Sequence, residues 1–214
     1  MAKYIVPTVL VKNRKELVKR LNLVKNYAQR AQMDIIDGRF APNKTIGPKS
    51  FKGIKTKLKT EMHLMVKDMD RYVDDFIKIK PRMLIMHIES CKNAKHTNEL
   101  IEKIKKAGIK TAIALKPETP ASKAKPFLKK IDQILVMMVH PGFYGGKFLP
   151  KMLQKIKQIR KWSRNIDIEV DGGIRPGTAK LCAKAGANIF CAGSFIFKAK
   201  NIKGAIEELK KDIR

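Results

Sequence analysis

The chain has 214 residues, of which 44% are hydrophobic, and such a length and composition are typical of one globular domain. No apolar run approaches the ~20 residues of a membrane span, and the N-terminal segment lacks the pattern of a secretion signal. The formal net charge of +28 favours nonspecific contact with polyanions, but the few aromatic residues are not interleaved with the lysines, so a dedicated nucleic-acid surface is not expected.

Short β-rich apolar runs alternate with amphipathic helical patterns along the whole chain. The predicted strands are Tyr4–Val11, Gln32–Ile36, Glu61–Val66, Met83–Ile88, Lys110–Leu115, Gln133–Val139, Ile166–Val170 and Ala187–Ala192. The predicted helices are Arg14–Ala28, Met69–Ile79, Asn98–Ala107, Ser122–Lys130, Pro150–Trp162, Thr178–Ala185 and Lys203–Ile213. The segment Phe40–Lys59 is less regular, and we expect it to hold only a short helix.

The regular alternation of eight strands with helices predicts a (β/α)8 barrel, also called a TIM barrel. No linker, low-complexity tract or composition break divides the sequence, so residues 1–214 are expected to form a single domain. A doubly wound open sheet is the alternative, although it would not need eight strands. In a barrel the carboxyl ends of the strands carry the chemistry, which makes polar residues at those ends the first candidates for a site.

Two aspartates stand near the ends of strands that a barrel would place almost opposite each other. Asp34 lies in the second predicted strand and Asp171 directly follows the seventh, while His63 lies in the third. A single aspartate at such a place is often a turn or a helix cap. Two facing carboxylates with a histidine between them instead favour a chemical role.

Glycines follow the last two predicted strands. Asp171-Gly172-Gly173-Ile174 comes after the seventh strand, and Ala192-Gly193-Ser194 ends the eighth. Glycine lets backbone N–H groups approach an anion closely, and the loops after strands 7 and 8 form a phosphate site in many barrels. These two loops therefore predict a phosphate site beside Asp171. The loop Gly142-Phe143-Tyr144-Gly145, after the sixth strand, has the glycines of an ordinary turn.

Several segments, in their order and spacing, resemble the ribulose-phosphate 3-epimerase family. They are Asp34-Ile-Ile-Asp-Gly-Arg-Phe-Ala-Pro-Asn43, His63-Leu-Met65, Val136-Met-Met-Val-His-Pro-Gly-Phe143, Val170-Asp-Gly-Gly-Ile174, Ala185-Gly-Ala187 and Ala192-Gly-Ser-Phe-Ile-Phe197. The resemblance implies a ribulose-phosphate-binding barrel and an isomerase of the pentose phosphate branch of carbohydrate metabolism. Such an enzyme interconverts D-ribulose 5-phosphate and D-xylulose 5-phosphate.

The resemblance also implies roles for individual residues. Asp34 and Asp171 would transfer protons on the two faces of an enediolate, and Asp34, His63 and Asp171 would hold a divalent metal ion, such as zinc, iron, manganese or cobalt, that stabilises it. Met65 and Met137 match methionines of the family pocket, and His87 is expected to be buried and hydrogen-bonded. Substrate contacts are implied for Thr8, His63, Gly142, Phe143, Tyr144, Gly145, Gly172, Gly173, Gly193 and Ser194. The resemblance also implies that the loop of residues 142–145 closes over the substrate as a lid, and an ordinary glycine-rich turn is the alternative.

One departure from the family pattern bears directly on the metal. Gln32 stands where the family has a histidine ligand, and a neutral amide is a poor ligand for zinc or iron, so weaker metal binding is expected. The same two acids would also serve a 3-epimerase of a hexulose 6-phosphate. Gln32 and the lysine excess also fit a third alternative, a barrel that binds phosphate or polyanions without turnover.

The expected partner is a sugar-phosphate substrate. No specific nucleic acid and no membrane are expected to bind, and a homo-oligomer is compatible with the sequence. Cys91, Cys182 and Cys191 show no Cys-x-x-Cys spacing, which predicts reduced thiols and a cytoplasmic location.

Overall fold

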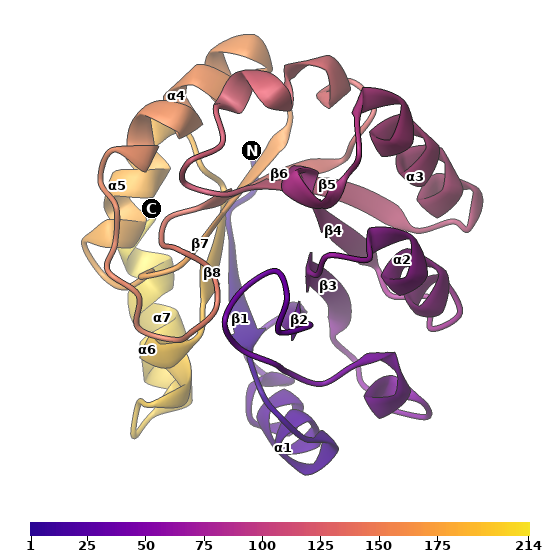
Figure 1. Cartoon of the computed structure of the whole chain (residues 1–214). Helices are drawn as coiled ribbons and strands as arrows, with labels where there is room; N and C mark the ends of the chain where they lie inside the picture. Colours follow the sequence, from indigo (N-terminus) through magenta and orange to yellow (C-terminus); the bar gives the residue numbers. More distant parts are fainter.

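The computed structural model describes residues 1–214 as eight parallel strands closed into a barrel, with helices around the outside (Figure 1). The strands are β1 Tyr4–Val9, β2 Arg30–Ile36, β3 Lys59–Met65, β4 Met83–His87, β5 Lys110–Leu115, β6 Gln133–Met137, β7 Asp167–Asp171 and β8 Ile189–Ala192. Each strand pairs with the next, and β8 closes onto β1 with Ile189 opposite Tyr4. The predicted (β/α)8 fold is confirmed, and the ends of all eight strands differ from the prediction by at most two residues.

Six of the seven predicted helices are present, and the short helix α6 (Ser194–Phe197) was not predicted. The helices are α1 Arg14–Val24, α2 Met69–Ile77, α3 Ala94–Lys106, α4 Met152–Trp162, α5 Thr178–Ala185, α6 Ser194–Phe197 and α7 Ile202–Asp212, with 3-10 helices η1 Pro48–Phe51, η2 Ile88–Ser90, η3 Ala121–Lys123 and η4 Lys125–Phe127. Helix α3 begins four residues earlier than predicted because the Asn93 side chain accepts a hydrogen bond from His96 N at 2.9 Å and caps the first turn. None of these helices has the length and apolar character needed to cross a membrane.

The helix predicted over Ser122–Lys130 is wrong. This segment folds as the two short turns η3 and η4 instead. Pro126 has no N–H to donate to a helical carbonyl and disfavours helical backbone at the preceding residue, so an α-helix cannot run through it. The neighbouring loop is held from outside, because Lys155 Nζ in α4 donates to the carbonyl oxygens of Lys116 and Thr119 at 2.8 and 2.6 Å.

The interior of the barrel is divided into an apolar and a polar side. Strand alternation turns seven buried apolar residues of β4, β5, β6 and its extension to one side, namely Met83, Ile85, Ala112, Ala114, Leu135, Met137 and Val139. The same alternation turns Gln32, Glu61, His63 and Glu169 inward from β2, β3 and β7, and all four are fully buried. A separate layer of 51 buried apolar residues packs the helices onto the barrel. The polar groups of the interior are therefore concentrated along β2, β3 and β7.

Buried carboxylates in the lower part of the barrel are paired. Glu61 forms ion pairs with Arg82 and, at 3.7 Å, with Arg30. Glu169 accepts a hydrogen bond from Gln133, and burial raises the pKa of Glu169 well above its usual value. Because a buried charge without a partner is strongly destabilising, this pairing keeps the polar side of the barrel compatible with a stable fold.

Candidate active site

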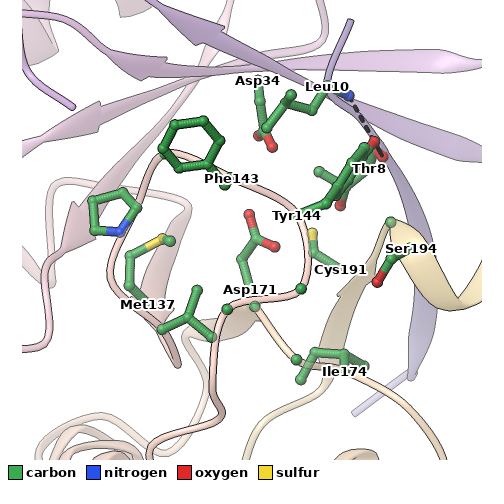
Figure 2. Close-up of a pocket in the computed structure, with 18 of the residues that line it drawn as sticks. Thr8, Leu10, Asp34, Met137, Phe143, Tyr144, Asp171, Ile174, Cys191 and Ser194 are labelled. Atoms are coloured by element: carbon green, nitrogen blue, oxygen red, sulfur yellow. Dashed lines mark hydrogen bonds between the residues drawn. The ribbon is translucent and has the colours of Figure 1, made fainter. Parts of the chain in front are cut away.

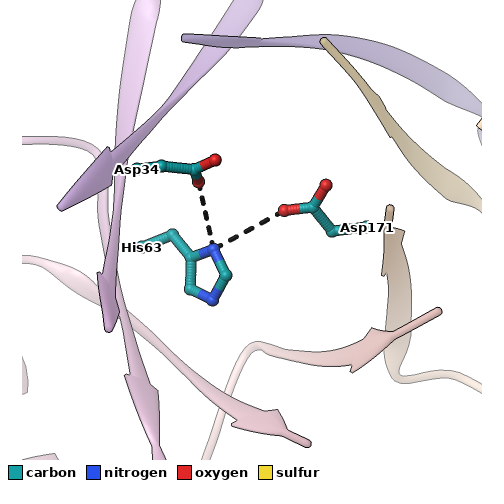
Figure 3. A group of neighbouring side chains, drawn as sticks. All are labelled: Asp34, His63 and Asp171. Atoms are coloured by element: carbon teal, nitrogen blue, oxygen red, sulfur yellow. Dashed lines mark hydrogen bonds and ion pairs between the residues drawn. The ribbon is translucent and has the colours of Figure 1, made fainter. Parts of the chain in front are cut away.

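Asp34 and Asp171 both point into the mouth of the barrel from β2 and β7 (Figure 2). Their side chains are only 8% and 12% exposed. The fully buried His63 connects them, because its Nδ1 atom lies 3.1 Å from Oδ1 of Asp34 and 3.6 Å from Oδ2 of Asp171 (Figure 3). The three residues that the sequence assigned to one site therefore lie together.

Gln32 occupies the space between the two carboxylates. Its Nε2 atom donates to Oδ2 of Asp171 at 2.7 Å and to Oδ1 of Asp34 at 3.0 Å, and it lies 3.4 Å from His63 Nδ1. On its other side, Oε1 accepts a hydrogen bond from the Cys191 thiol at 3.4 Å. Both protons of the amide thus have carboxylate acceptors, which no histidine at this position could reproduce with one nitrogen.

The donor set and its spacing fit a divalent cation. The ligand atoms of Asp34, His63 and Asp171 all lie within 4.8 Å of one another. With Gln32 Nε2 as a fourth vertex, the measured separations run from 2.7 to 3.6 Å, and ligands about 2.0–2.1 Å from a tetrahedral ion are about 3.3 Å apart. Rotation of the Gln32 amide by half a turn would replace Nε2 by Oε1 at that vertex. The site therefore suits three strong ligands and one weak one.

The surroundings of this cluster raise the pKa values of Asp34 and His63 above their usual values. Burial and the charge of Asp171 raise the pKa of Asp34 to about 6, against the lowering effect of its hydrogen bonds with His63 and Gln32. Burial lowers the pKa of His63, but hydrogen bonds and charges from Asp171 and Asp34 outweigh it and raise the value to about 10. In the absence of a cation, the imidazolium of His63 is thus the positive charge that faces the carboxylates.

The glycine loops after β7 and β8 form one wall of the same pocket (Figure 2). Gly172 and Gly173 have φ values of +105° and +66°, where side chains other than hydrogen are strained. A Cβ atom at Gly193 would overlap the ring of Tyr144 and lie 3.2 Å from a backbone oxygen of β1. Ser194 follows as the first residue of α6. All four residues line the pocket, beside the carboxylates.

Tyr144 fastens the loop after β6 across the pocket to the end of β1. Its hydroxyl donates to the carbonyl oxygen of Thr8 at 2.7 Å and accepts from Leu10 N at 2.8 Å (Figure 2). The guanidinium of Arg20 in α1 adds a contact at 3.3 Å to the same hydroxyl. The loop therefore lies closed over the pocket, in the place expected of a lid.

The rest of the lid is held more loosely. Gly142 O accepts a hydrogen bond from Asn43 Nδ2 at 2.7 Å, whereas the Phe143 side chain is 59% exposed. Gly142 and Gly145 have φ values of +135° and +81°, so both turns of the loop depend on glycine. Asn43, which fixes the start of the lid, belongs to the segment that carried the family resemblance, but no role was predicted for it.

Thr8 supplies an unpaired polar group to the pocket. The residue is 2% exposed, and its Oγ1 atom has no hydrogen-bond partner. Met65 and Met137 also line the pocket, as the resemblance implied. A buried hydroxyl without a partner is costly unless another group completes its hydrogen bonds, so Thr8 is available to a ligand.

The sequence did not reveal the contact between His63 and His87. The predicted buried, hydrogen-bonded state of His87 is confirmed, since the ring is fully buried and its Nε2 atom lies 2.9 Å from His63 Nε2. The alternation Met83, Ile85, His87 in β4 could have indicated an inward direction. The meeting of the two rings depends on the stagger of β3 against β4, which no local pattern specifies.

Comparison with known proteins identifies the family of this chain. The sequence matches the family described as the ribulose-phosphate 3 epimerase family over residues 4–197. The chain belongs to that family. Ribulose-phosphate 3-epimerase of Bacillus subtilis is 37% identical to it over 193 residues, which span 87% of this chain and 88% of the relative. The cytoplasmic isoform from Oryza sativa is 38% identical over 196 residues, spanning 89% and 85%.

Solved structures with much lower identity share the barrel of this epimerase-family chain. A 3-hexulose-6-phosphate synthase superposes with a TM-score of 0.75 at 15% identity and covers 99% of this chain and 100% of its own. Orotidine 5'-phosphate decarboxylase from Pyrococcus horikoshii reaches a TM-score of 0.66 at 16% identity, covering 98% and 99%. At such identities the likeness establishes the fold alone.

Proposed function

We propose that the protein epimerises C3 of a ketose phosphate, with D-ribulose 5-phosphate and D-xylulose 5-phosphate as its substrate pair. The observation that carries the proposal is the convergence of Asp34 and Asp171 on one pocket from two different sides of the barrel. Family membership and identities of 37% and 38% to enzymes named for this reaction support the choice of substrate.

Inversion at C3 needs one proton-transfer group on each face of that carbon. A carboxylate on one face takes the C3 hydrogen as a proton, and the C–H electron pair moves into an enediolate whose negative charge rests on the C2 oxygen. A carboxyl group on the other face then donates a proton to C3. Asp34 and Asp171 are the two groups, and a pKa of about 6 suits Asp34 to both directions of the exchange.

Asp34, His63 and Asp171 are also the residues that would hold a divalent cation. When bound, such an ion neutralises the negative charge that develops on the enediolate oxygens. Oxygen and imidazole nitrogen ligands together are compatible with zinc, manganese, iron or cobalt. While no ion is bound, Gln32 links the carboxylates of Asp34 and Asp171 through its two N–H hydrogen bonds.

The remaining pocket residues bind and shield the substrate in this proposal. The backbone of Gly172, Gly173, Gly193 and Ser194 lies where it can donate to a phosphate group, and the unpaired Thr8 hydroxyl can contact the sugar. The closed loop of residues 142–145 keeps water away from the enediolate, which would otherwise be open to side reactions.

The cysteines support a cytoplasmic location. Cys91, Cys182 and Cys191 are all free, and burial raises the pKa of the Cys182 thiol to about 12 and that of the Cys191 thiol well above its usual value. Thiols of this kind are inert towards exchange and suit a reducing compartment. The rice relative is likewise named as a cytoplasmic isoform.

The decisive experiment is to incubate the purified protein with D-ribulose 5-phosphate and follow D-xylulose 5-phosphate by NMR. The reaction is run in chelator and again with Zn²⁺, Mn²⁺, Fe²⁺ or Co²⁺ added. We expect xylulose 5-phosphate to form, with incorporation of solvent deuterium at C3 when the solvent is D₂O. No product under any of these conditions would contradict the proposal.

A further inference from the structure

Glu89, in the turn η2 after β4, is a fixed hydrogen-bond acceptor. Its Oε1 atom accepts from the backbone N–H of Lys116 at 2.8 Å and from the hydroxyl of Thr119. Its Oε2 atom lies 3.0 Å from Nδ1 of His87. Burial would raise the pKa of Glu89, but the hydrogen bonds from His87, Thr119 and Lys116 lower it to about 2. An ionised carboxylate can only accept hydrogen bonds. The proton between Glu89 Oε2 and His87 Nδ1 is therefore bonded to Nδ1 of His87.

This assignment settles the direction of the next hydrogen bond. A neutral imidazole with its proton on Nδ1 has a lone pair on Nε2. The Nε2 atoms of His87 and His63 are 2.9 Å apart, so His63 Nε2 must carry the proton of that bond. The rings stack at an interplanar angle of 25°, and Phe40 packs on His87 with ring centroids 4.6 Å apart. These contacts prevent either imidazole from turning over.

We propose that Glu89 and His87 are positioning residues that hold a proton on Nε2 of His63, so that Nδ1 is the nitrogen presented to a cation between Asp34 and Asp171. Metal-binding histidines commonly need such a partner on their second nitrogen, because it selects the tautomer and fixes the ring. The role of His63 Nδ1 as a metal ligand rests on the proposed function. The positions of the protons in the hydrogen bonds that join Glu89, His87 and His63 do not.

The substitution Glu89→Gln should move the proton of His87 from Nδ1 to Nε2 and remove the proton from Nε2 of His63. Lys116 N–H is an obligate donor, so the oxygen of the new amide must stay on that side and its NH₂ group must face His87. His87 would then lose its Nδ1 proton and carry one on Nε2, and His63 Nε2 would become an acceptor. His63 would keep only its Nδ1 proton, which Asp34 Oδ1 accepts at 3.1 Å. Because every donor keeps an acceptor, the variant should fold.

Nitrogen-15 NMR of histidine-labelled protein tests this order of protons directly. Protonated and bare ring nitrogens of histidine resonate in separate regions, and the chain has only four histidines, which single substitutions can assign. In the natural protein without a cation we expect protons on His87 Nδ1 and on both ring nitrogens of His63. In Glu89→Gln we expect protons on His87 Nε2 and His63 Nδ1, with His63 Nε2 bare. The control is Glu118→Gln, the same change of charge in the adjacent loop at a carboxylate that pairs with the exposed His140. A proton on His87 Nε2 in the natural protein, or unchanged tautomers in Glu89→Gln, would overturn the proposal.

Substitutions of His87 give a second, independent test. His87→Gln can donate to Glu89 and accept from His63 through one amide, so it should preserve the proton on His63 Nε2, whereas His87→Phe removes the acceptor and should not. Equal tautomers in the two variants would contradict the proposal. Cation titration by calorimetry should then show at least tenfold weaker binding to Glu89→Gln than to Glu118→Gln. Unchanged affinity in a variant whose tautomers have reversed would contradict the metal site of the proposed function, while the proton order itself would stand.

Discussion

The Nε2 atom of Gln32 lies 2.7 Å from Oδ2 of Asp171, at a point where its protons compete with a cation for the same carboxylate oxygens. Any ion that binds must displace two N–H hydrogen bonds, each worth about 1.5–3 kcal/mol when the acceptor is charged. In return, Gln32 can offer the ion at best its amide oxygen as a ligand. We therefore expect these polar contacts, as well as the loss of a histidine ligand, to weaken cation binding here.

Gln32→His should tighten cation binding by more than tenfold. The change removes the competing N–H donors and adds an imidazole ligand that suits zinc, manganese and iron better than an amide does. Calorimetric titration with Zn²⁺ and Mn²⁺ measures the effect, and Gln32→Met serves as the control because it also removes the donors but adds no ligand suited to these ions. Equal, negligible affinity in the natural protein and Gln32→His would mean that Asp34, His63 and Asp171 do not form a metal site.

Asp34→Asn and Asp171→Asn should each abolish epimerisation and leave the barrel folded. Loss of one proton-transfer group removes one face of the mechanism and should lower kcat by at least the ~10²–10⁴-fold typical of acid–base catalysis. Circular dichroism checks the fold, and NMR in D₂O follows exchange at C3. A variant that exchanges the C3 hydrogen without inversion would identify the acid that remains. Full activity in either variant would refute a mechanism with two acids.

The acidic residues and the histidine of the site could be predicted from the sequence, because the ends of the strands in a barrel converge whatever the details of packing. Asp34, His63 and Asp171 could be grouped from their places in β2, β3 and β7 alone. The orientation of the Gln32 amide could not, since it depends on the Cys191 thiol behind it and on two carboxylates from other strands. The same holds for the pair of His63 and His87, which the stagger of neighbouring strands brings together.

The fold was predictable wherever periodicity and turn chemistry agreed. The eight strands are short apolar runs with clear ends, so their bounds were nearly right. The helix predicted over Ser122–Lys130 does not form because Pro126 interrupts the hydrogen bonds of a helix. Helix α3 shows the reverse case, since Asn93 was a readable N-cap that lay outside the apolar stripe.

Gly193→Val should raise KM for ribulose 5-phosphate strongly. The new side chain would overlap the ring of Tyr144 and occupy the wall where the phosphate is proposed to bind, so both substrate binding and lid closure suffer. Gly47→Val is the matched control, because no atom lies within 4 Å of a Cβ there and the backbone has an ordinary conformation. Steady-state kinetics of the two variants give the comparison. An unchanged KM in Gly193→Val would place the phosphate elsewhere.

The buried pair of His87 and Glu89 should make the protein sensitive to acid. The pKa of Glu89 is lowered from 4.5 to about 2, so its contribution to stability is present above pH 4.5 and is lost as the pH falls through 2. Full loss amounts to roughly 3 kcal/mol at 1.36 kcal/mol per pKa unit. Urea unfolding of the natural protein and Glu89→Gln between pH 6 and 3 measures this, and the difference between them should shrink towards the acid end. A difference independent of pH would contradict the depressed pKa.

The hydroxyl of Tyr144 forms hydrogen bonds with Thr8 and Leu10 at the end of β1. Because these bonds hold the loop of residues 142–145 over the pocket, we expect substrate to enter while they are broken. Apparent affinity is reduced by the fraction of molecules that are open at a given moment. The same hydrogen bonds that shield the intermediate slow the binding of substrate and the release of product. We therefore expect kcat to be limited by the rate at which the Tyr144 hydrogen bonds break, not by proton transfer.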